Sequence, residues 1–162
     1  MNIRKAEEKE LDAIEAVYAH ARRFMKENGN PTQWGDRYPP RAMLEDDIRR
    51  GELYVMEEDG RIVGVFLLAI GEDPTYQVIE DGQWRRQEPY GTIHRLASNG
   101  SAKGVAAACY EFCKQKCAYL RADTHRDNLP LQRTVEKAGF RRCGIIHIAD
   151  GTPRIAYDYF AE

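Results

Sequence analysis

The sequence predicts a mixed α/β fold: a mostly antiparallel sheet with one central β-α-β unit and helices on both faces. Two hairpin signals, at 52–70 and 140–160, flank a strand, glycine turn, helix and strand at 90–124. Hairpins pair antiparallel, whereas a strand–helix–strand crossover pairs parallel and is right-handed. The expected order is therefore β-α-α-β-β-β-α-β-α-β-β, without an internal repeat.

Apolar periodicity and turn residues locate each element. The elements expected before residue 90 are a strand at 2–5, a helix at 7–27, a loop at 32–40, a helix at 41–50, strands at 52–57 and 61–70, and an irregular segment at 71–89. Those that follow are a strand at 90–97, a helix at 102–117, a strand at 119–124, a helix opening at 128–130 and closed by Gly139, and strands at 140–148 and 154–160.

Size and composition narrow the range of functions that the chain can have. We expect the 162 residues (1–162) to form a single domain with one core. The 24 basic and 26 acidic residues are nearly balanced, which gives no support for a general nucleic-acid binder. No apolar run approaches the roughly 20 residues of a membrane helix, and residues 1–9 lack a signal-peptide pattern. We expect a cytoplasmic protein without nucleic-acid or membrane partners; homodimerisation stays open.

The segment after residue 90 has the pattern of an anion site. A strand runs into the polar turn 98–104, and a helix pattern begins at Val105. The first amides of a helix have no internal partner, and the helix dipole adds positive charge there. Gly104 allows the backbone to approach a ligand closely, and small residues follow it. We predict that this turn binds the diphosphate of a cofactor.

Three of the four cysteines repeat every four residues on that helix, at Cys109, Cys113 and Cys117. No CxxC spacing is present, and Cys143 would complete a metal site only by coincidence of the fold. We therefore predict a buried stripe of small apolar side chains, with neither a metal nor a disulfide.

Three stretches, LASNGSAKGVA at 96–106, DTHRDN at 123–128 and EKAGFRRCG at 136–144, resemble the GNAT N-acetyltransferase superfamily, as does the order of elements over nearly the whole chain. The resemblance implies that acetyl-CoA is the cofactor. It also implies that pantetheine lies between two strands that splay apart, that the glycine turn binds the pyrophosphate, and that a backbone N–H of the first strand meets the acetyl carbonyl.

The resemblance assigns cofactor contacts by position. Leu96 and Ser98 would offer backbone groups to pantetheine and the thioester. Gly104 and Ala106 fit the family turn, whereas Ser101 replaces the usual Gln or Arg. The implied cofactor-binding residues are Leu96, Ala97, Ser98, Ser101, Ala102, Lys103, Gly104, Val105, Ala106 and Asn128. Lys103 either contacts a phosphate or is solvated, and Asn128 can contact the cofactor, cap the next helix, or do both.

Acetyl transfer to an amine also needs a proton acceptor. His94 is the first choice, because it lies two residues before Leu96 and so should share its strand face. A hydrogen-bonded core histidine is the alternative. Asp123 and His125 are second candidates, although Asp123 can equally tie down the loop that follows. Many members of the superfamily place a Tyr, the general acid, seven residues after the Asn; this chain has Val135 there, so Tyr157 is a candidate acid.

Aromatic residues in irregular segments, namely Trp34, Tyr38, Tyr76 and Trp84, are candidates for the acceptor pocket. A satellite core is the alternative, above all for Trp84. Glu80, Asp81 and Glu88 either attract a cationic amine or form a solvated acidic face.

We therefore expect an acetyl-CoA-dependent N-acetyltransferase that acts on a primary amine of a small molecule or peptide by direct attack in a ternary complex. A non-catalytic acyl-CoA sensor is the alternative. A different nucleotide-binding β-α-β protein is disfavoured, because a dinucleotide fold is mostly parallel. The identity of the acceptor stays open, since one scaffold serves many acceptors.

Overall fold

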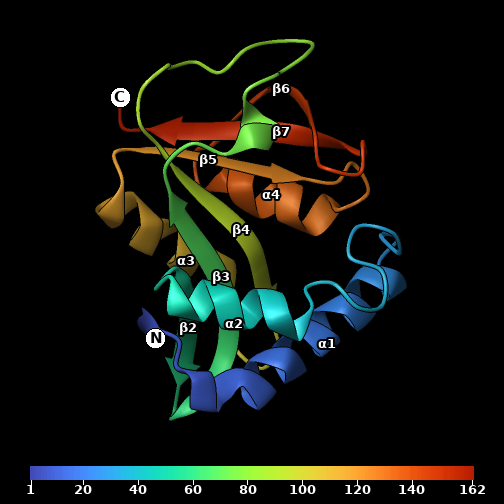
Figure 1. The fold of residues 1–162 in the computed structure, drawn as a ribbon, viewed down its shortest axis with the longest axis vertical. Helices are drawn as coiled ribbons and strands as arrows, with labels where there is room; N and C mark the ends of the chain where they lie inside the picture. The colour runs from blue at the N-terminus through green and yellow to red at the C-terminus, as the bar shows by residue number, and fades with distance from the viewer.

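The computed structural model describes residues 1–162 and contains a seven-stranded sheet in the order β1-β2-β3-β4-β5-β7-β6 (Figure 1). Its strands are β1 (Asn2–Lys5), β2 (Leu53–Glu58), β3 (Arg61–Ile70), β4 (Gly91–Ser98), β5 (Tyr119–Thr124), β6 (Arg141–His147) and β7 (Pro153–Phe160). Its helices are α1 (Leu11–Glu27), α2 (Arg41–Arg49), α3 (Val105–Lys116) and α4 (Leu129–Lys137), with short 3-10 turns at Glu8–Glu10 and Pro74–Tyr76. Only β4 and β5 pair in parallel, which confirms the predicted fold class.

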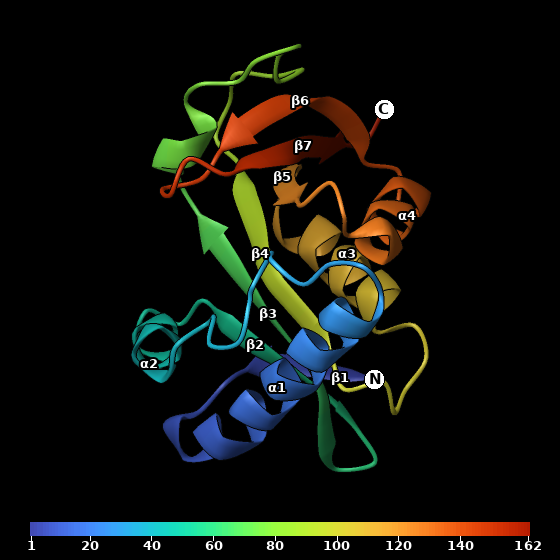
Figure 2. The ribbon, with the colours of Figure 1, turned by 90° about the vertical axis from the view of Figure 1, so that its right-hand side faces the viewer.

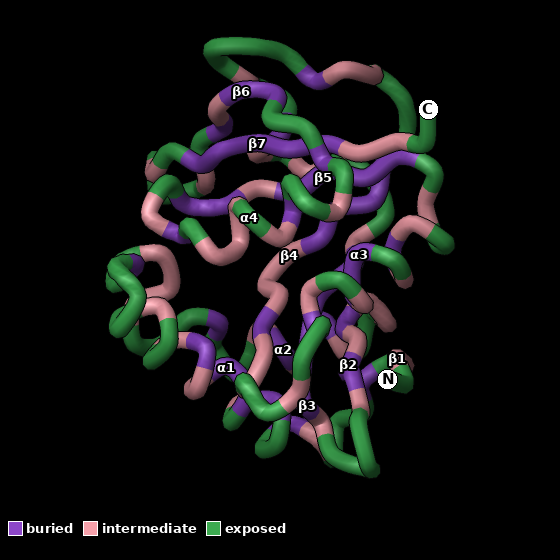
Figure 3. Tube along the Cα trace, turned by 180° about the vertical axis from the view of Figure 1, so that it is seen from behind, coloured by how far each residue is buried: buried purple, intermediate pink, exposed green.

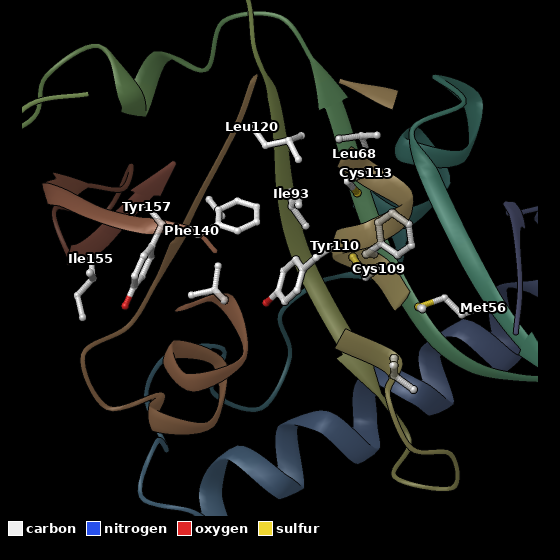
Figure 4. Close-up of a cluster of buried hydrophobic side chains, with 14 of the residues drawn as sticks. Met56, Leu68, Ile93, Cys109, Tyr110, Cys113, Leu120, Phe140, Ile155 and Tyr157 are labelled. Carbon is white, nitrogen blue, oxygen red and sulfur yellow. The ribbon is translucent and has the colours of Figure 1, made fainter. Parts of the chain in front are cut away.

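Helices cover both faces of the sheet (Figure 2). On one face, Ile14 and Tyr18 of α1 pack with Val55, Val65 and Ala97 of the strands. On the other face, the apolar side of α3 packs on the strands, and Figure 4 shows Cys109, Tyr110 and Cys113 beside Ile93 and Leu120. Cys109 and Cys113 are fully buried there, which confirms the predicted apolar stripe. None of the helices combines the length and the apolar composition that a membrane-spanning segment requires.

The irregular segment 71–89 closes the half of the sheet that α1 and α2 leave open. Tyr76, Trp84 and Tyr90 pack with Tyr119 and Ala156 in a third apolar cluster. Ala156 lies between two residues of β7 that face α3 and α4, so this cluster lies on the opposite face of the sheet. Figure 3 shows β5 and β7 largely buried below this segment, which is mostly exposed itself. A few aromatic anchors therefore hold a long loop onto the sheet.

Strands β4 and β5 diverge after a short pairing. They pair only from Gly91 with Leu120 to Ile93 with Ala122. The backbone of β4 beyond Ile93 therefore has no partner on the β5 side. The sheet is therefore split along this line.

A β-bulge lies at the same point of β4. Arg95 has a φ of 53°, and the pairing with β3 shifts register there. Because a bulge adds one residue, the alternation of faces is interrupted. Leu96 packs against the same cluster as Ile93, whereas His94 contacts Asp73 on the other face. The prediction that His94 and Leu96 share a strand face is therefore wrong.

Candidate active site

A cavity of about 910 Å³ opens between β4 and β5 and reaches both faces of the sheet. Its walls come from α1, the 32–43 segment, β4, the first turns of α3 and α4, the end of β5, and β7. This volume lies within the range of ligand-binding pockets in proteins, roughly 300 to 1,000 Å³. The pairing that stops at Ile93 creates the opening.

The first turn of α3 forms one end of the cavity. Gly104 is the N-cap with a left-handed φ of 75°, and no side chain caps the helix. An added Cβ at Gly104 would meet no atom within 4 Å, so the approach to the amides is open. Val105 and Ala106 line the cavity directly. The free amides and the helix dipole make this end suited to a phosphate group.

Polar side chains of the preceding turn are used to fold it. Ser98 Oγ accepts a hydrogen bond from the Gly100 amide at 3.1 Å. Asn99 Oδ1 accepts from both the amide and the hydroxyl of Ser101, at 3.0 and 2.6 Å. Ala102 packs against the apolar cluster under α3, and Lys103 is exposed. An anion here would therefore be held mainly by backbone amides rather than by the Ser101 hydroxyl.

Asn128 closes the opposite wall at the start of α4. Its Oδ1 accepts from the Leu131 amide at 3.2 Å, which confirms the predicted N-cap. Its Nδ2 donates to Gln33 Oε1 at 2.9 Å. Asn128 also lines the cavity, so it joins α4 to the 32–43 segment across the cavity wall.

His94 faces the cavity from the other side of the sheet. Its Nε2 lies 2.9 Å from Asp73 Oδ2, and its Nδ1 lies 4.0 Å from Asp123 Oδ2. Burial alone would raise the pKa of Asp73, but the hydrogen bonds from His94 and Thr75 lower that pKa to about 2. Asp73 is therefore ionised at neutral pH and fixes the orientation of the imidazole. His94 is hydrogen-bonded yet remains one-quarter exposed.

Asp123 lies at the end of β5 beside His94. Its side-chain hydrogen bond comes from Tyr76, whose hydroxyl donates to Oδ2 at 2.5 Å, and burial raises the pKa of Tyr76 well above its ordinary value. No hydrogen bond joins the Asp123 carboxylate to residues 124–128, so it does not hold that loop. Asp123 is instead a carboxylate of the cavity wall that Tyr76 holds in place.

The geometry therefore combines an open helix end, a split pair of parallel strands and a histidine–aspartate pair within one cavity. The profile described as "Acetyltransferase (GNAT) family" matches residues 11–140. The chain belongs to the GNAT acetyltransferase family.

Solved structures agree with this assignment. An acetyltransferase of the GNAT family from Streptococcus agalactiae is 30% identical, with a TM-score of 0.87 over 99% of this chain and 95% of that chain. A putative acetyltransferase from Staphylococcus aureus is 25% identical, with a TM-score of 0.71 over 99% of both chains. A ribosomal-protein-alanine N-acetyltransferase from Brucella melitensis shares the fold at 18% identity, with a TM-score of 0.63. No curated protein matches the chain significantly.

This GNAT protein has Val135 in the cavity wall and two nearby tyrosines. Tyr157 donates to Glu136 Oε2 at 3.2 Å, and burial raises the pKa of Tyr157 to about 12. The sequence patterns did not mark Tyr110 as a candidate site residue. Its position four residues after Ala106, on the same face of α3, could have done so. Its hydroxyl is 3.2 Å from Thr134 Oγ1. Figure 4 shows Tyr110 and Tyr157 reaching into the same region from α3 and β7.

The four aromatic candidates for the acceptor pocket separate into two pairs. Trp34 and Tyr38 line the cavity, with Trp34 packed edge-on against Tyr18 at 5.6 Å between ring centroids. Trp84 is only 5% exposed, and its Nε1 donates to the Tyr76 carbonyl at 2.8 Å. Tyr76 and Trp84 do not line the cavity, because segment 71–89 folds them into the third apolar cluster. Both rings therefore belong to a satellite core and not to the wall of this cavity.

The remaining polar candidates also lie outside the cavity. His125 is buried, its Nδ1 accepts from the Asp127 amide at 3.0 Å, and burial followed by the nearby Arg154 lowers its pKa. The Glu80, Asp81 and Glu88 side chains belong to a segment that is largely exposed. This pattern is that of a solvated acidic face rather than a part of the pocket.

Proposed function

We propose that the protein is an acetyl-CoA-dependent N-acetyltransferase that transfers acetyl directly to a primary amine of a small molecule or peptide in a ternary complex. The observation that carries this proposal is the single cavity that joins the open end of α3 to His94 through the gap between β4 and β5. Membership of the GNAT family supports the acyl-transfer chemistry.

The residues of the cavity fit coenzyme A. The Gly104 position leaves the amides of Val105 and Ala106 open to the pyrophosphate. The β4 backbone from Leu96 to Ser98, unpaired on the β5 side, suits the extended amide chain of pantetheine. The 101–104 turn and Asn128 complete the proposed contacts. When bound, the cofactor supplies an acetyl thioester, whose C–S bond breaks as the amine nitrogen bonds to the acetyl carbon, leaving a thiolate.

His94 is the proposed general base. Since ionised Asp73 accepts a hydrogen bond from Nε2, we assign the ring proton to Nε2, which leaves the lone pair of Nδ1 to accept the proton of the amine. Asp123, near Nδ1, would stabilise the positive charge that the ring then carries. The Leu96 amide, next to the bulge, is the proposed donor to the acetyl oxygen.

Tyr157 is a weak candidate for the general acid. Its pKa of about 12 lies above the roughly 8.5 of an ordinary thiol, so full proton transfer to a thiolate would be unfavourable. We propose that the hydroxyl of Tyr157 at most hydrogen-bonds the leaving sulfur, which then takes its proton from water. A thiolate leaves readily, so Val135 in place of a tyrosine does not exclude turnover.

Two measurements test the proposal together. Calorimetry with acetyl-CoA should show binding, and thiol release with a broad panel of amines should show turnover, with the acetylated amine identified by mass spectrometry. Val135 favours the second candidate function, a non-catalytic acyl-CoA sensor, because it removes the usual acid. Binding without acetyl transfer across the panel would replace the enzyme with the sensor. Absence of binding would refute both.

A further inference from the structure

The acceptor side of the cavity contains a buried cation that the proposed mechanism does not use. Arg154 is the second residue of β7, lines the cavity and is only 6% exposed. A guanidinium carries five N–H donors. Its one hydrogen bond here runs from Nη1 to the Pro153 carbonyl at 3.5 Å. Most of the donors of Arg154 therefore have no protein partner.

The carboxylates around Arg154 do not satisfy it. Its Nε lies 4.0 Å from Asp123 Oδ1, beyond hydrogen-bond distance, and the Asp123 carboxylate is already bonded by Tyr76. Asp150 accepts a hydrogen bond from the Thr152 amide within its own turn. Burial lowers the pKa of Arg154, but the group stays charged at neutral pH. A buried guanidinium with free donors is a strong site for an anion.

We propose that Arg154 binds a carboxylate of the acceptor, which makes the acceptor a free amino acid or a closely related amine. This inference rests on the proposed acetyl transfer. His94 and Arg154 lie on either side of Asp123, each 4.0 Å from one of its oxygens. The reacting nitrogen and the carboxylate of the acceptor must therefore be close together in the molecule. In a peptide longer than a few residues they are too far apart, unless a side chain supplies the carboxylate.

The charges of the cavity match such a molecule. Asp73 and Asp123 attract an ammonium group, and Arg154 attracts a carboxylate a few ångströms away. A simple diamine or polyamine would instead place a second cation beside Arg154. The arrangement therefore favours a zwitterionic acceptor over a polycationic one.

The experiment compares each L-amino acid with its amide and its decarboxylated amine in the thiol-release assay. The wild type should acetylate at least one amino acid with a kcat/KM about 10- to 100-fold above that of its amide, because charge-assisted hydrogen bonds contribute selectively. Arg154→Met should reduce this ratio to near 1 without changing the Kd of acetyl-CoA. Arg126→Met, at an exposed arginine outside the cavity, should leave the ratio unchanged.

The outcomes separate the two proposals. Equal acetylation of amides and amines, or a preference that survives Arg154→Met, would overturn the carboxylate site and leave acetyl transfer intact. Binding of acetyl-CoA without acetylation of any amine would overturn both. If Arg154→Met does not fold, inhibition of the wild-type enzyme by acceptor analogues tests the carboxylate site instead. The carboxylic acid without its amino group should then compete with the acceptor, and its amide should not. Equal inhibition by the acid and the amide would refute the site.

Discussion

His94 Nε2 and Asp73 Oδ2 lie 2.9 Å apart, although 21 positions separate the two residues in the sequence. The 3-10 turn at Pro74–Tyr76 holds Asp73 in place, since Asp73 Oδ1 accepts from both the amide and the hydroxyl of Thr75. The Tyr90 hydroxyl accepts a hydrogen bond from the Asp73 amide at 2.7 Å. The long irregular loop therefore delivers one fixed carboxylate to the proposed base.

This pair predicts an acid-dependent loss of stability. The pKa of Asp73 falls from an ordinary 3.8 to about 2, so ionised Asp73 stabilises the folded state at pH above about 4. That stability, about 2 kcal/mol, should be lost as the pH falls from about 4 to about 2. Asp73→Asn should remove this part of the pH dependence, as measured by urea unfolding. Identical pH slopes for the two proteins would contradict the assignment.

Removal of the proposed base should impair turnover but not cofactor binding. His94→Ala should lower kcat by about 100-fold or more at neutral pH, because a positioned general base contributes on that order. The Kd of acetyl-CoA should stay unchanged. His147→Ala, at an exposed histidine of β6 outside the cavity, is the matched control and should leave kcat unaffected. An unaltered pH–rate profile in His94→Ala would exclude His94 as the base.

The open end of α3 can be tested with two equivalent glycines. Gly104 and Gly60 have φ values of 75° and 74°, and a Cβ at either would meet no atom within 4 Å. An aspartate at either position therefore carries similar backbone strain. Only Gly104→Asp also places a negative charge at the proposed pyrophosphate site. Gly104→Asp should weaken acetyl-CoA binding at least 10-fold by calorimetry, whereas Gly60→Asp should not. Equal affinities would argue against this anion site.

Local signals in the sequence were sufficient for the fold and for the open first turn of α3 at one end of the cavity. Hairpin turns, apolar periodicity and the glycine turn before Val105 depend on neighbouring residues, and the structure has elements at nearly the predicted bounds. The Asn128 cap is equally local, because its acceptor bonds an amide three residues later. The order of hairpins around one β-α-β unit then leaves few arrangements of the sheet.

The other end of the cavity, around His94 and Arg154, depends on long-range packing that local patterns do not encode. The bulge at Arg95 follows from a register shift against β3, and it reverses the face expected for Leu96. The 71–89 segment places Trp84 in the core, because Trp84 and its aromatic neighbours Tyr76 and Tyr90 pack against residues of β5 and β7. Arg154 has no neighbouring motif. It reaches the cavity because β7 pairs antiparallel with β5, as far as Ile155 with Thr124, and with β6, where Arg154 itself pairs with Ile146.

The hydroxyl of Tyr157 should contribute little to catalysis. Because a group with a pKa of about 12 is a poor acid toward a thiolate, Tyr157→Phe should lower kcat by less than about 10-fold. Steady-state thiol release at saturating acetyl-CoA measures this directly. A loss of 100-fold or more, with unchanged thermal stability, would instead identify Tyr157 as an essential proton donor.

A substitution that adds one negative charge can separate the capping role of Asn128 from its proposed contact with the cofactor. Aspartate is as good an N-cap as asparagine, so Asn128→Asp should keep the hydrogen bond to the Leu131 amide and the stability of α4. It loses the Nδ2 donor to Gln33 and adds a negative charge to the cavity wall. If the cofactor lies against this wall, Asn128→Asp should weaken acetyl-CoA binding several-fold by calorimetry while Tm changes little.

Asn128→Ala should lower the free energy of unfolding by about 1 kcal/mol, because it removes the cap without adding charge. A weaker cofactor affinity in Asn128→Ala than in Asn128→Asp would mean that the cap, and not the charge at the wall, controls binding.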